Sequence, residues 1–549
     1  MSIIIFDIGG TGARCAAAGL CALTAGAAGD LPNLGKQIVH WHVDKDETNG
    51  TASRSKTIIG SYQKWARQLG ADAGVYDVSY KQWNINTAVN NPNAKLKVTF
   101  SAPGNQRLMD MLFGEDDQKR ELANGFEQRP ALGALYFERI KDQIDTELGV
   151  VLNDAKSKAG TDAIFIFGSV FGGSGAAMIH NLAKYVRKYV NDHGWGGVKI
   201  GAALLLPYFE IPPLDDKQIE KRKEDGVLAL QTSDLMLAAQ KALHYYASID
   251  DFVASPGRDD YHFDAFYPIG MRPLCNNIAP SVKLTAAHYH EGKSGQGSAF
   301  SVTDLIAAQA MCDFLRKAND DALAPDDEYA NIFVAVLGSD PFKTLDWSHL
   351  PNAAFLRKKL LTMTKFALFV TTFIYPEFKA RLGKQDKKAI KASSYGKWFA
   401  GNYTGTDVAL EEVYAYCYQF LRFIEEVAGT VQGKTRICDL FDVANLGSIL
   451  TSLDTFKSAD DDEKVDLFNS IRNDADTFFN KKVGGLLKKL GNGQVEVPEQ
   501  ISYSSDVIKT AIEGVLPAPN VLRKAKDKTT VLFRTILAQC AKLTEEGIV

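Results

Sequence analysis

Two glycine-rich segments, each directly after a short apolar run, constrain this chain more than any other feature. The first, residues 9–14 (GGTGAR), follows residues 3–8, and the second, residues 168–176 (GSVFGGSGA), follows residues 162–167. Glycine lets the backbone approach an anion, and a following helix N-terminus offers unpaired N–H groups. One such loop can serve packing alone, but a bare turn rarely needs three glycines with an interleaved serine. The pair therefore predicts a nucleotide-binding site.

The N-terminal part of the chain alternates between apolar runs and helix-like segments. Such alternation is typical of a doubly wound α/β fold with a parallel sheet, whose ligands bind at the carboxyl ends of the strands. The predicted strands are 3–8, 36–43, 95–102, 162–167 and 198–206, and the predicted helices are 12–24, 53–68, 129–149 and 174–191.

Later segments predict three further parts. Residues 223–248 have helical apolar spacing and are expected to cross the body as a central helix. Mixed strand-like and helix-like runs then suggest a small α/β unit, and amphipathic helices dominate after Pro351. The expected organisation is a nucleotide-binding domain over 1–222, the central helix over 223–248, a small α/β domain over 249–345 and a helical C-terminal domain over 346–549.

Composition excludes several classes of protein. The chain has 549 residues, a formal net charge of -4 and 23% charged residues, so nothing suggests a phosphate-neutralising surface for nucleic acid. Its seven cysteines are odd in number and contain no C-x-x-C, which argues against a disulfide framework and favours a reducing cytoplasm. The apolar stretch 366–375 is too short to span a membrane, and the start is expected to be a strand, not a signal peptide.

The two loops resemble those of the tubulin/FtsZ superfamily, in which one glycine loop follows the first strand and a GGGTGSG-like loop follows the fourth. The similarity is nearer to the divergent bacterial tubulin-like proteins, with GGTGAR near the start and GSVFGGTGA later; it covers about residues 1–310. The resemblance implies a GTP-binding protein, GTP hydrolysis and self-association into filaments or oligomers. It implies binding of GTP, or another purine nucleotide, through Gly9, Gly10, Thr11, Gly12, Ala13, Arg14, Gly168, Ser169, Phe171, Gly172, Gly173, Ser174, Gly175 and Ala176.

An acidic turn follows the second predicted strand and resembles the family's DxDxxNG turn. Asp44, Asp46 and Asn49 are expected to reach Mg²⁺ or the ribose, with Asp44 and Asp46 as metal ligands, since Mg²⁺ prefers oxygen ligands. An ordinary acidic turn is the alternative. The resemblance also implies that the central helix contacts the base, near Gln231 and Asp234.

Asp304 is the candidate catalytic carboxylate. The resemblance implies an acid supplied by the next subunit, which would orient the water that attacks the γ-phosphate. Asp304 also lies in the first turn of a predicted helix capped by Ser301, where a carboxylate stabilises the helix N-terminus. Both roles stay open from the sequence.

Other functions compete with the assembling GTPase. A nucleotide-sensing scaffold that does not polymerise, with an operon-encoded partner in a bacterial defence or signalling system, would fit the departure of the C-terminal part from tubulins. Residues 6–11 (FDIGGT) also look like the first phosphate motif of actin-like sugar kinases, but the alanine-rich segment 13–22 predicts a helix where those enzymes have a hairpin. A Rossmann dehydrogenase has no role for the second loop.

Two pairs of alternating histidines complete the candidates. His40 with His42, and His288 with His290, could bind a metal, but no third ligand is near in sequence, so packed histidines are expected. Ser174 has no identifiable His and Asp partners, which argues against covalent acyl catalysis.

Overall fold

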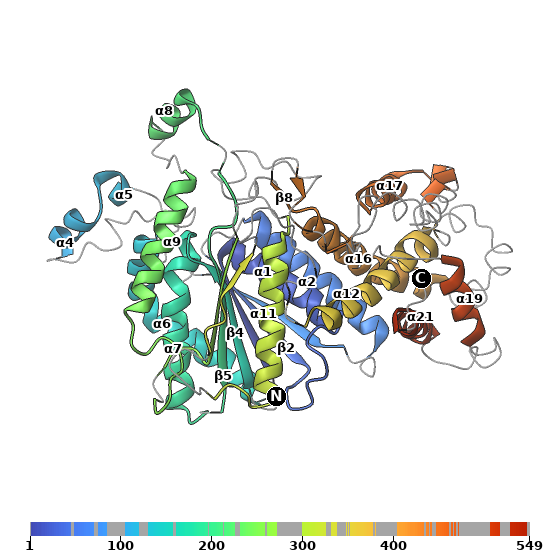
Figure 1. The fold of residues 1–549 in the computed structure, drawn as a ribbon, viewed down its shortest axis with the longest axis horizontal. Helices are drawn as coiled ribbons and strands as arrows, with labels where there is room; N and C mark the ends of the chain where they lie inside the picture. Colours follow the sequence, from blue (N-terminus) through green and yellow to red (C-terminus); the bar gives the residue numbers. More distant parts are fainter. Residues whose placement is uncertain are drawn as a thin grey trace, which may run out of the picture.

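A computed structural model of the chain shows a parallel sheet covered by helices on both faces, with a further group of helices beside it (Figure 1). The structure describes residues 2–44, 49–70, 75–84, 105–119, 130–157, 161–195, 197–211, 213–224, 231–258, 261–271, 299–324, 331–337, 347, 350, 352–376, 379, 403–432, 435–436, 438, 440–441, 446–460, 463–464, 466–467, 470–471, 505–515 and 528–545.

The sheet has seven parallel strands in the order β3-β2-β1-β4-β5-β6-β7. The central strands are continuous apolar runs, as expected for strands buried on both faces. The strand order reverses between β1 and β4, and such a switch point is where open α/β sheets bind ligands. The strands are β1 (Ser2–Ile8), β2 (Gln37–Asp44), β3 (Asp77–Asn84), β4 (Thr161–Ser169), β5 (Lys199–Leu205), β6 (Ala265–Met271) and β7 (Ala335–Leu337).

Helices cover both faces of the sheet, so the predicted doubly wound fold is confirmed (Figure 1). One face carries α1 (Gly9–Thr24), α2 (Gly50–Leu69) and α11 (Val302–Asn319). The other carries α6 (Pro130–Ser157) and α7 (Gly173–Asp192), with α9 (Thr232–Ala247) packed on α7. Three short helices complete this part: α4 (Asn105–Leu112), α5 (Glu115–Lys119) and α8 (Asp216–Glu224).

The third strand of the sheet differs from the predicted one. Residues 77–84 form β3, whereas the predicted strand 95–102 lies outside the described residues. β3 pairs with β2 at one end of the sheet, and among its described side chains Val78 and Trp83 are buried while residues 77 and 79–82 are partly or fully exposed. Such a strand lacks the continuous apolar run that marks the central ones.

The segment 249–345 also differs from the predicted small unit, because β6 and β7 extend the same sheet beside β5. A central helix is present, but it is α11 and not residues 223–248. α11 is buried almost throughout and packs against α1, β5 and the C-terminal helix α16 (Tyr403–Ala428). Residues 223–248 instead include the end of α8 and all of α9, which buries only Leu235, Ala239 and Tyr246.

The predicted helical C-terminal region is confirmed over its described residues. It comprises α12 (Ala353–Leu368), which continues into a π-helix (Phe369–Ile374), then α16, α17 (Leu446–Ser458), α19 (Ser505–Val515) and α21 (Lys528–Glu545), with a short hairpin of β8 (Val431–Gln432) and β9 (Thr435–Arg436). Most of the predicted helix 462–480 lies outside the described residues. None of the described helices is long and apolar enough to cross a membrane.

The C-terminal helices pack on the α1, α2 and α11 side of the sheet (Figure 1). Trp65 of α2 contacts Tyr416 of α16 at a ring distance of 5.1 Å. At the other end of α2, Thr530 Oγ1 and Arg534 Nε of α21 donate hydrogen bonds to the carbonyls of Gln68 and Leu69. The two parts of the chain therefore share one packed interface.

Candidate nucleotide-binding site

The first glycine loop passes directly from β1 into α1. Gly9 has φ +70°, a conformation that favours glycine, and a Cβ there would lie 3.5 Å from Ser174 Cβ and 3.8 Å from Gly175 N. At Gly12 a Cβ would lie 2.7 Å from the carbonyl oxygen of Phe167, so α1 sits hard against β4. The first loop therefore touches the second one, although about 160 residues separate them.

The second glycine loop connects β4 to α7. A Cβ at Gly175 would lie 2.8 Å from the Ser169 carbonyl oxygen and 2.9 Å from its nitrogen, so the loop folds back tightly on the end of β4. Gly172, Gly173, Ser174 and Ala176 are partly exposed, as are Gly10 and Thr11 of the first loop. These residues form the accessible surface between the two loops.

The helices that begin at the two loops share a property that marks an anion site. Neither α1, after Ile8, nor α7, after Gly172, has a side-chain cap at its N-terminus. By contrast, α2, α9 and α11 are capped by their own side chains, whereas α12 lacks a cap as well, so the missing caps point to an anion site only together with the meeting of the two loops. An uncapped helix N-terminus presents N–H groups and the positive end of the helix dipole, which favour phosphate.

Asp44 joins this site from the end of β2. The Ser174 hydroxyl donates a hydrogen bond of 2.9 Å to Asp44 Oδ1, and Asp44 is only 4% exposed. Asn49 instead caps α2 by accepting hydrogen bonds from Thr51 N and Ala52 N. Asp46 lies outside the described residues. Of the two described residues, Asp44 therefore contacts the second loop, whereas Asn49 caps α2.

Arg14 does not point its charge at an open anion site. Its Nε donates a 2.8 Å hydrogen bond to Asp304 Oδ2, and a second nitrogen donates to the Tyr208 hydroxyl. Burial, the largest single effect, would lower the pKa of the Arg14 guanidinium, but Asp304, Tyr208 and Cys15 together raise it above its ordinary value. The loop thus offers its backbone N–H groups, while the arginine is held by α11.

The prediction of Asp304 as a catalytic acid is contradicted by its position. Its side chain is 0% exposed, accepts from Ser301 N at 2.7 Å in a capping box, and neutralises Arg14. A carboxylate with this burial and these partners is not accessible from the surface between the two loops. The alternative role, stabilisation of a helix N-terminus, is the one the structure shows.

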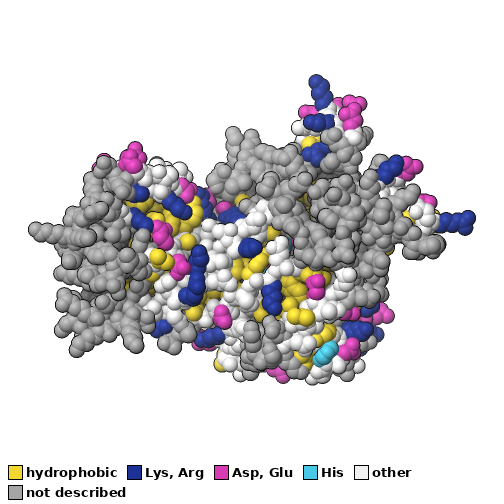
Figure 2. All heavy atoms as spheres, turned by 180° about the vertical axis from the view of Figure 1, so that it is seen from behind, with side chains coloured by type: hydrophobic (Ala, Val, Ile, Leu, Met, Phe, Trp, Pro, Cys, Tyr) yellow, Lys and Arg dark blue, Asp and Glu magenta, His cyan; other side chains and the backbone are white. Residues whose placement is uncertain are grey.

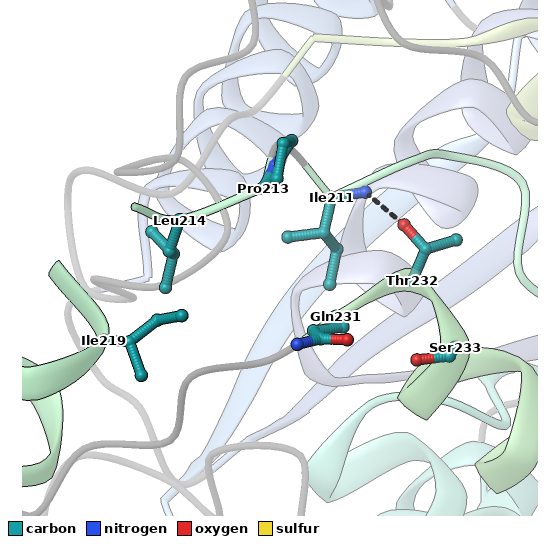
Figure 3. A pocket seen from close by; sticks show the side chains of 7 residues that line it. All are labelled: Ile211, Pro213, Leu214, Ile219, Gln231, Thr232 and Ser233. Atoms are coloured by element: carbon teal, nitrogen blue, oxygen red, sulfur yellow. Dashed lines mark hydrogen bonds between the residues drawn. The ribbon is translucent and has the colours of Figure 1, made fainter. Parts of the chain in front are cut away.

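A pocket of about 340 Å³ lies at the start of α9 (Figure 3). Gln231, Thr232 and Ser233 form its polar wall, and Thr232 Oγ1 accepts a hydrogen bond from Ile211 N. Asp234 caps α9 by accepting from Gln231 N. The remaining lining residues are Ile211, Pro213, Leu214 and Ile219. Gln231 thus lines a pocket, whereas Asp234 has a helix-capping role.

Sequence reasoning missed the segment that connects this pocket to the second loop. Phe209 packs against Phe171 at a ring distance of 5.5 Å, and Tyr208 both packs on Phe171 and holds Arg14. The aromatic pair directly after the fifth strand, in LPYFEIPP, was the available signal. Ile211, which lines the pocket, therefore lies only two residues after Phe209, whose ring contacts the second loop.

The packed state predicted for His40 and His42 is confirmed. Both rings are buried and hydrogen-bonded to Asp7 of β1, through His40 Nε2 and His42 Nδ1. Burial would raise the pKa of Asp7, but the two imidazoles lower it below its ordinary value. His288 and His290 lie outside the described residues. Over the described ranges no group of three or more potential ligands is arranged to hold a metal ion.

Comparison with known proteins does not assign this chain to a family. No protein-family model and no curated protein matches the sequence. A solved structure described as CetZ2 from Haloferax volcanii, GTPgS-bound protofilament, is similar at 14% identity and a TM-score of 0.26, covering 58% of this chain and 59% of that chain. The match thus spans less than two thirds of that protein, and likeness at this level does not identify a family. What identifies the site is the meeting of its two glycine loops.

Proposed function

We propose that the chain is a tubulin-like GTP-binding protein whose nucleotide state controls self-assembly. The observation that carries the proposal is the meeting of two uncapped helix N-termini, at Gly9 and Gly173, on the carboxyl edge of β1 and β4. Amides from both loops would hold the phosphates. The base preference for guanine follows from the resemblance of the loop sequences to the tubulin/FtsZ superfamily.

Magnesium fits this proposal through Asp44. Its carboxylate stands beside Ser174 at the rim of the second loop, where it could bind Mg²⁺ together with phosphate oxygens and water. Asp46 is the predicted second ligand. The metal would neutralise charge that develops on the phosphates, while Asp44 and the loop amides position it.

A non-polymerising nucleotide sensor is the second candidate, and the sealed position of Asp304 favours it. The capping box and the ion pair with Arg14 engage the Asp304 carboxylate, which the assembling GTPase would need for hydrolysis. Binding, not hydrolysis, is therefore the primary property we propose. The helix formed by Gly9–Thr24 argues against the actin-like sugar kinase, in which a hairpin is expected at this position.

Nucleic acid is not among the proposed ligands. On the face seen in Figure 2, basic and acidic side chains are interspersed among apolar ones over the part that the structure describes. A nucleic-acid site would instead gather lysine and arginine along one stripe.

The test is titration of purified protein with fluorescent GTP and ATP in Mg²⁺, with unlabelled GTP as competitor, followed by pelleting. Saturable GTP binding supports the proposal, and pelleting above a critical concentration separates the assembling GTPase from the sensor. Gly173→Asp should abolish binding, because a carboxylate would repel phosphate at an uncapped helix N-terminus.

Gly60→Asp is the matched control, since it adds the same charge in the middle of α2, where nothing lies within 4 Å of an added Cβ. Unchanged affinity in Gly173→Asp would remove the second loop from the site. Failure of both nucleotides to bind the unmodified protein would refute the proposed function.

A further inference from the structure

The end of α16 lies against two helices whose first turns adjoin the candidate site. Glu426 Oε2 accepts hydrogen bonds from the backbone N of Phe300, at 2.7 Å, and from Arg54 Nη1, at 2.8 Å. Glu426 is 6% exposed, and the Arg54 guanidinium also lies 4.8 Å over the Phe300 ring. One carboxylate from the C-terminal helices thus joins α2 to the start of α11.

Thr430, just beyond α16, makes the second connection. Its Oγ1 accepts a 3.0 Å hydrogen bond from Val302 N and donates to the Val427 carbonyl, and the residue is 0% exposed. Amides in the first turn of a helix have no partner within the helix. At α11 the C-terminal half of the chain therefore supplies acceptors for Phe300 N and Val302 N.

Both joined helices lead directly to the glycine loops. In α11, Asp304 follows these amides and pairs with Arg14 in the second turn of α1. In α2, Arg54 lies just over one turn after the Asn49 cap, and Asn49 is five residues after Asp44 in the sequence. The path through α11 ends in the buried ion pair of Asp304 with Arg14, and the described path through α2 runs from Arg54 to the Asn49 cap.

From these contacts we infer that Glu426 and Thr430 form a latch through which the C-terminal helices set the nucleotide affinity of the site. The inference rests on the proposed nucleotide binding. When the latch is closed, the first turns of α2 and α11 are held in register with α1, so Asp44 and the first loop keep their binding geometry. Coupling of this kind is reciprocal, so nucleotide also tightens the latch.

The test compares GTP affinity in three variants of the full chain: two that change the latch and one control. Glu426→Gln removes the charge that holds Arg54, and Thr430→Val removes the acceptor for Val302 N without leaving a buried charge unpaired. Each should weaken GTP binding by roughly tenfold, within the range of typical coupling energies. Thr430→Val still decides the matter if Glu426→Gln does not fold.

Glu412→Gln is the matched control. Glu412 lies on the same helix and also bonds to α2, through Gln68 Nε2 at 2.7 Å, but at the opposite end of α2 from the loops. Its loss should leave GTP affinity within about twofold, as for most changes outside such a network. An equal loss in all three variants would mean general destabilisation and would overturn the latch.

Hydrogen exchange supplies a second readout. GTP should slow amide exchange in peptides that cover residues 299–304 and 423–430 of the unmodified protein, and this slowing should vanish in Thr430→Val. If GTP binds but neither exchange nor affinity responds to the variants, the latch is refuted and the proposed function stands. If the unmodified protein binds no nucleotide, both fall.

Discussion

Replacing Gly12 with alanine tests how closely α1 approaches the sheet. An added Cβ would lie 2.7 Å from the carbonyl oxygen of Phe167 and 3.1 Å from the carbonyl carbon of Asp7. Both are backbone atoms of central strands, so no side chain can turn aside to make room. The variant must push α1, and the first glycine loop with it, away from β1 and β4.

Two opposing contributions decide the size of the effect. Alanine is favoured over glycine inside a helix by about 1 kcal/mol. Overpacking a buried site costs about 1–3 kcal/mol and sometimes more, and overlap with fixed backbone belongs at the upper end. We therefore expect Gly12→Ala to lower the free energy of unfolding by roughly 2 kcal/mol.

Gly60→Ala on α2 isolates the favourable contribution, because no heavy atom lies within 4 Å of its added Cβ. It should raise the stability by up to about 1 kcal/mol. Thermal unfolding of both variants, followed by circular dichroism beside the unmodified chain, should show melting temperatures that shift in opposite directions. A rise for Gly12→Ala, matching that of Gly60→Ala, would refute the close contact between α1 and β4.

Two further predictions concern buried charges. Asp304→Asn leaves the Arg14 guanidinium buried without its counter-charge, so the free energy of unfolding should fall by about 3–5 kcal/mol; an unchanged melting temperature would restore a purely catalytic role. Burial, then the charges of His262 and Lys184, lowers the pKa of His180 from 6.5 to about 4. Between pH 6.5 and 4 the unfolded chain therefore binds a proton at His180 that the folded chain does not bind. The free energy of unfolding should fall by roughly 3 kcal/mol as the pH drops across this range. His180→Phe should flatten this part of the stability profile, and a profile as steep as before would contradict the assignment.

The elements around the two glycine loops could be predicted from the sequence because each is marked locally. Continuous apolar runs mark β1, β4 and β5, and the loops that follow β1 and β4 mark the starts of α1 and α7. β3 escaped prediction because its two buried residues, Val78 and Trp83, lie five positions apart, which is neither a continuous apolar run nor a strict alternation. Continuous apolar runs and helical apolar spacing are informative locally, whereas an edge strand with neither pattern is missed.

The contacts that define the site's surroundings could not be predicted, since they join residues far apart in the chain. Arg14 pairs with Asp304 across 290 positions, and Glu426 reaches Arg54 across 372. Nothing in the sequence near Arg14 distinguishes an arginine that binds phosphate from one that holds a buried carboxylate. The central position of α11 follows from these long-range pairings. Without them, the sequence pattern favours the earlier amphipathic segment, residues 223–248, as the central helix.

The contact between α21 and α2 has a consequence for synthesis of the chain on the ribosome. Thr530 and Arg534 complete the C-terminal end of α2, a helix that ends at Leu69. At 5–20 residues per second, α21 emerges roughly 20–90 s after α2 has been made. Until α16 has been made, which is earlier than α21, the nascent N-terminal part also carries an aromatic face, with Tyr62 and Trp65, that Tyr416 does not yet cover. Translation speed and chaperone supply should therefore affect the yield of folded protein.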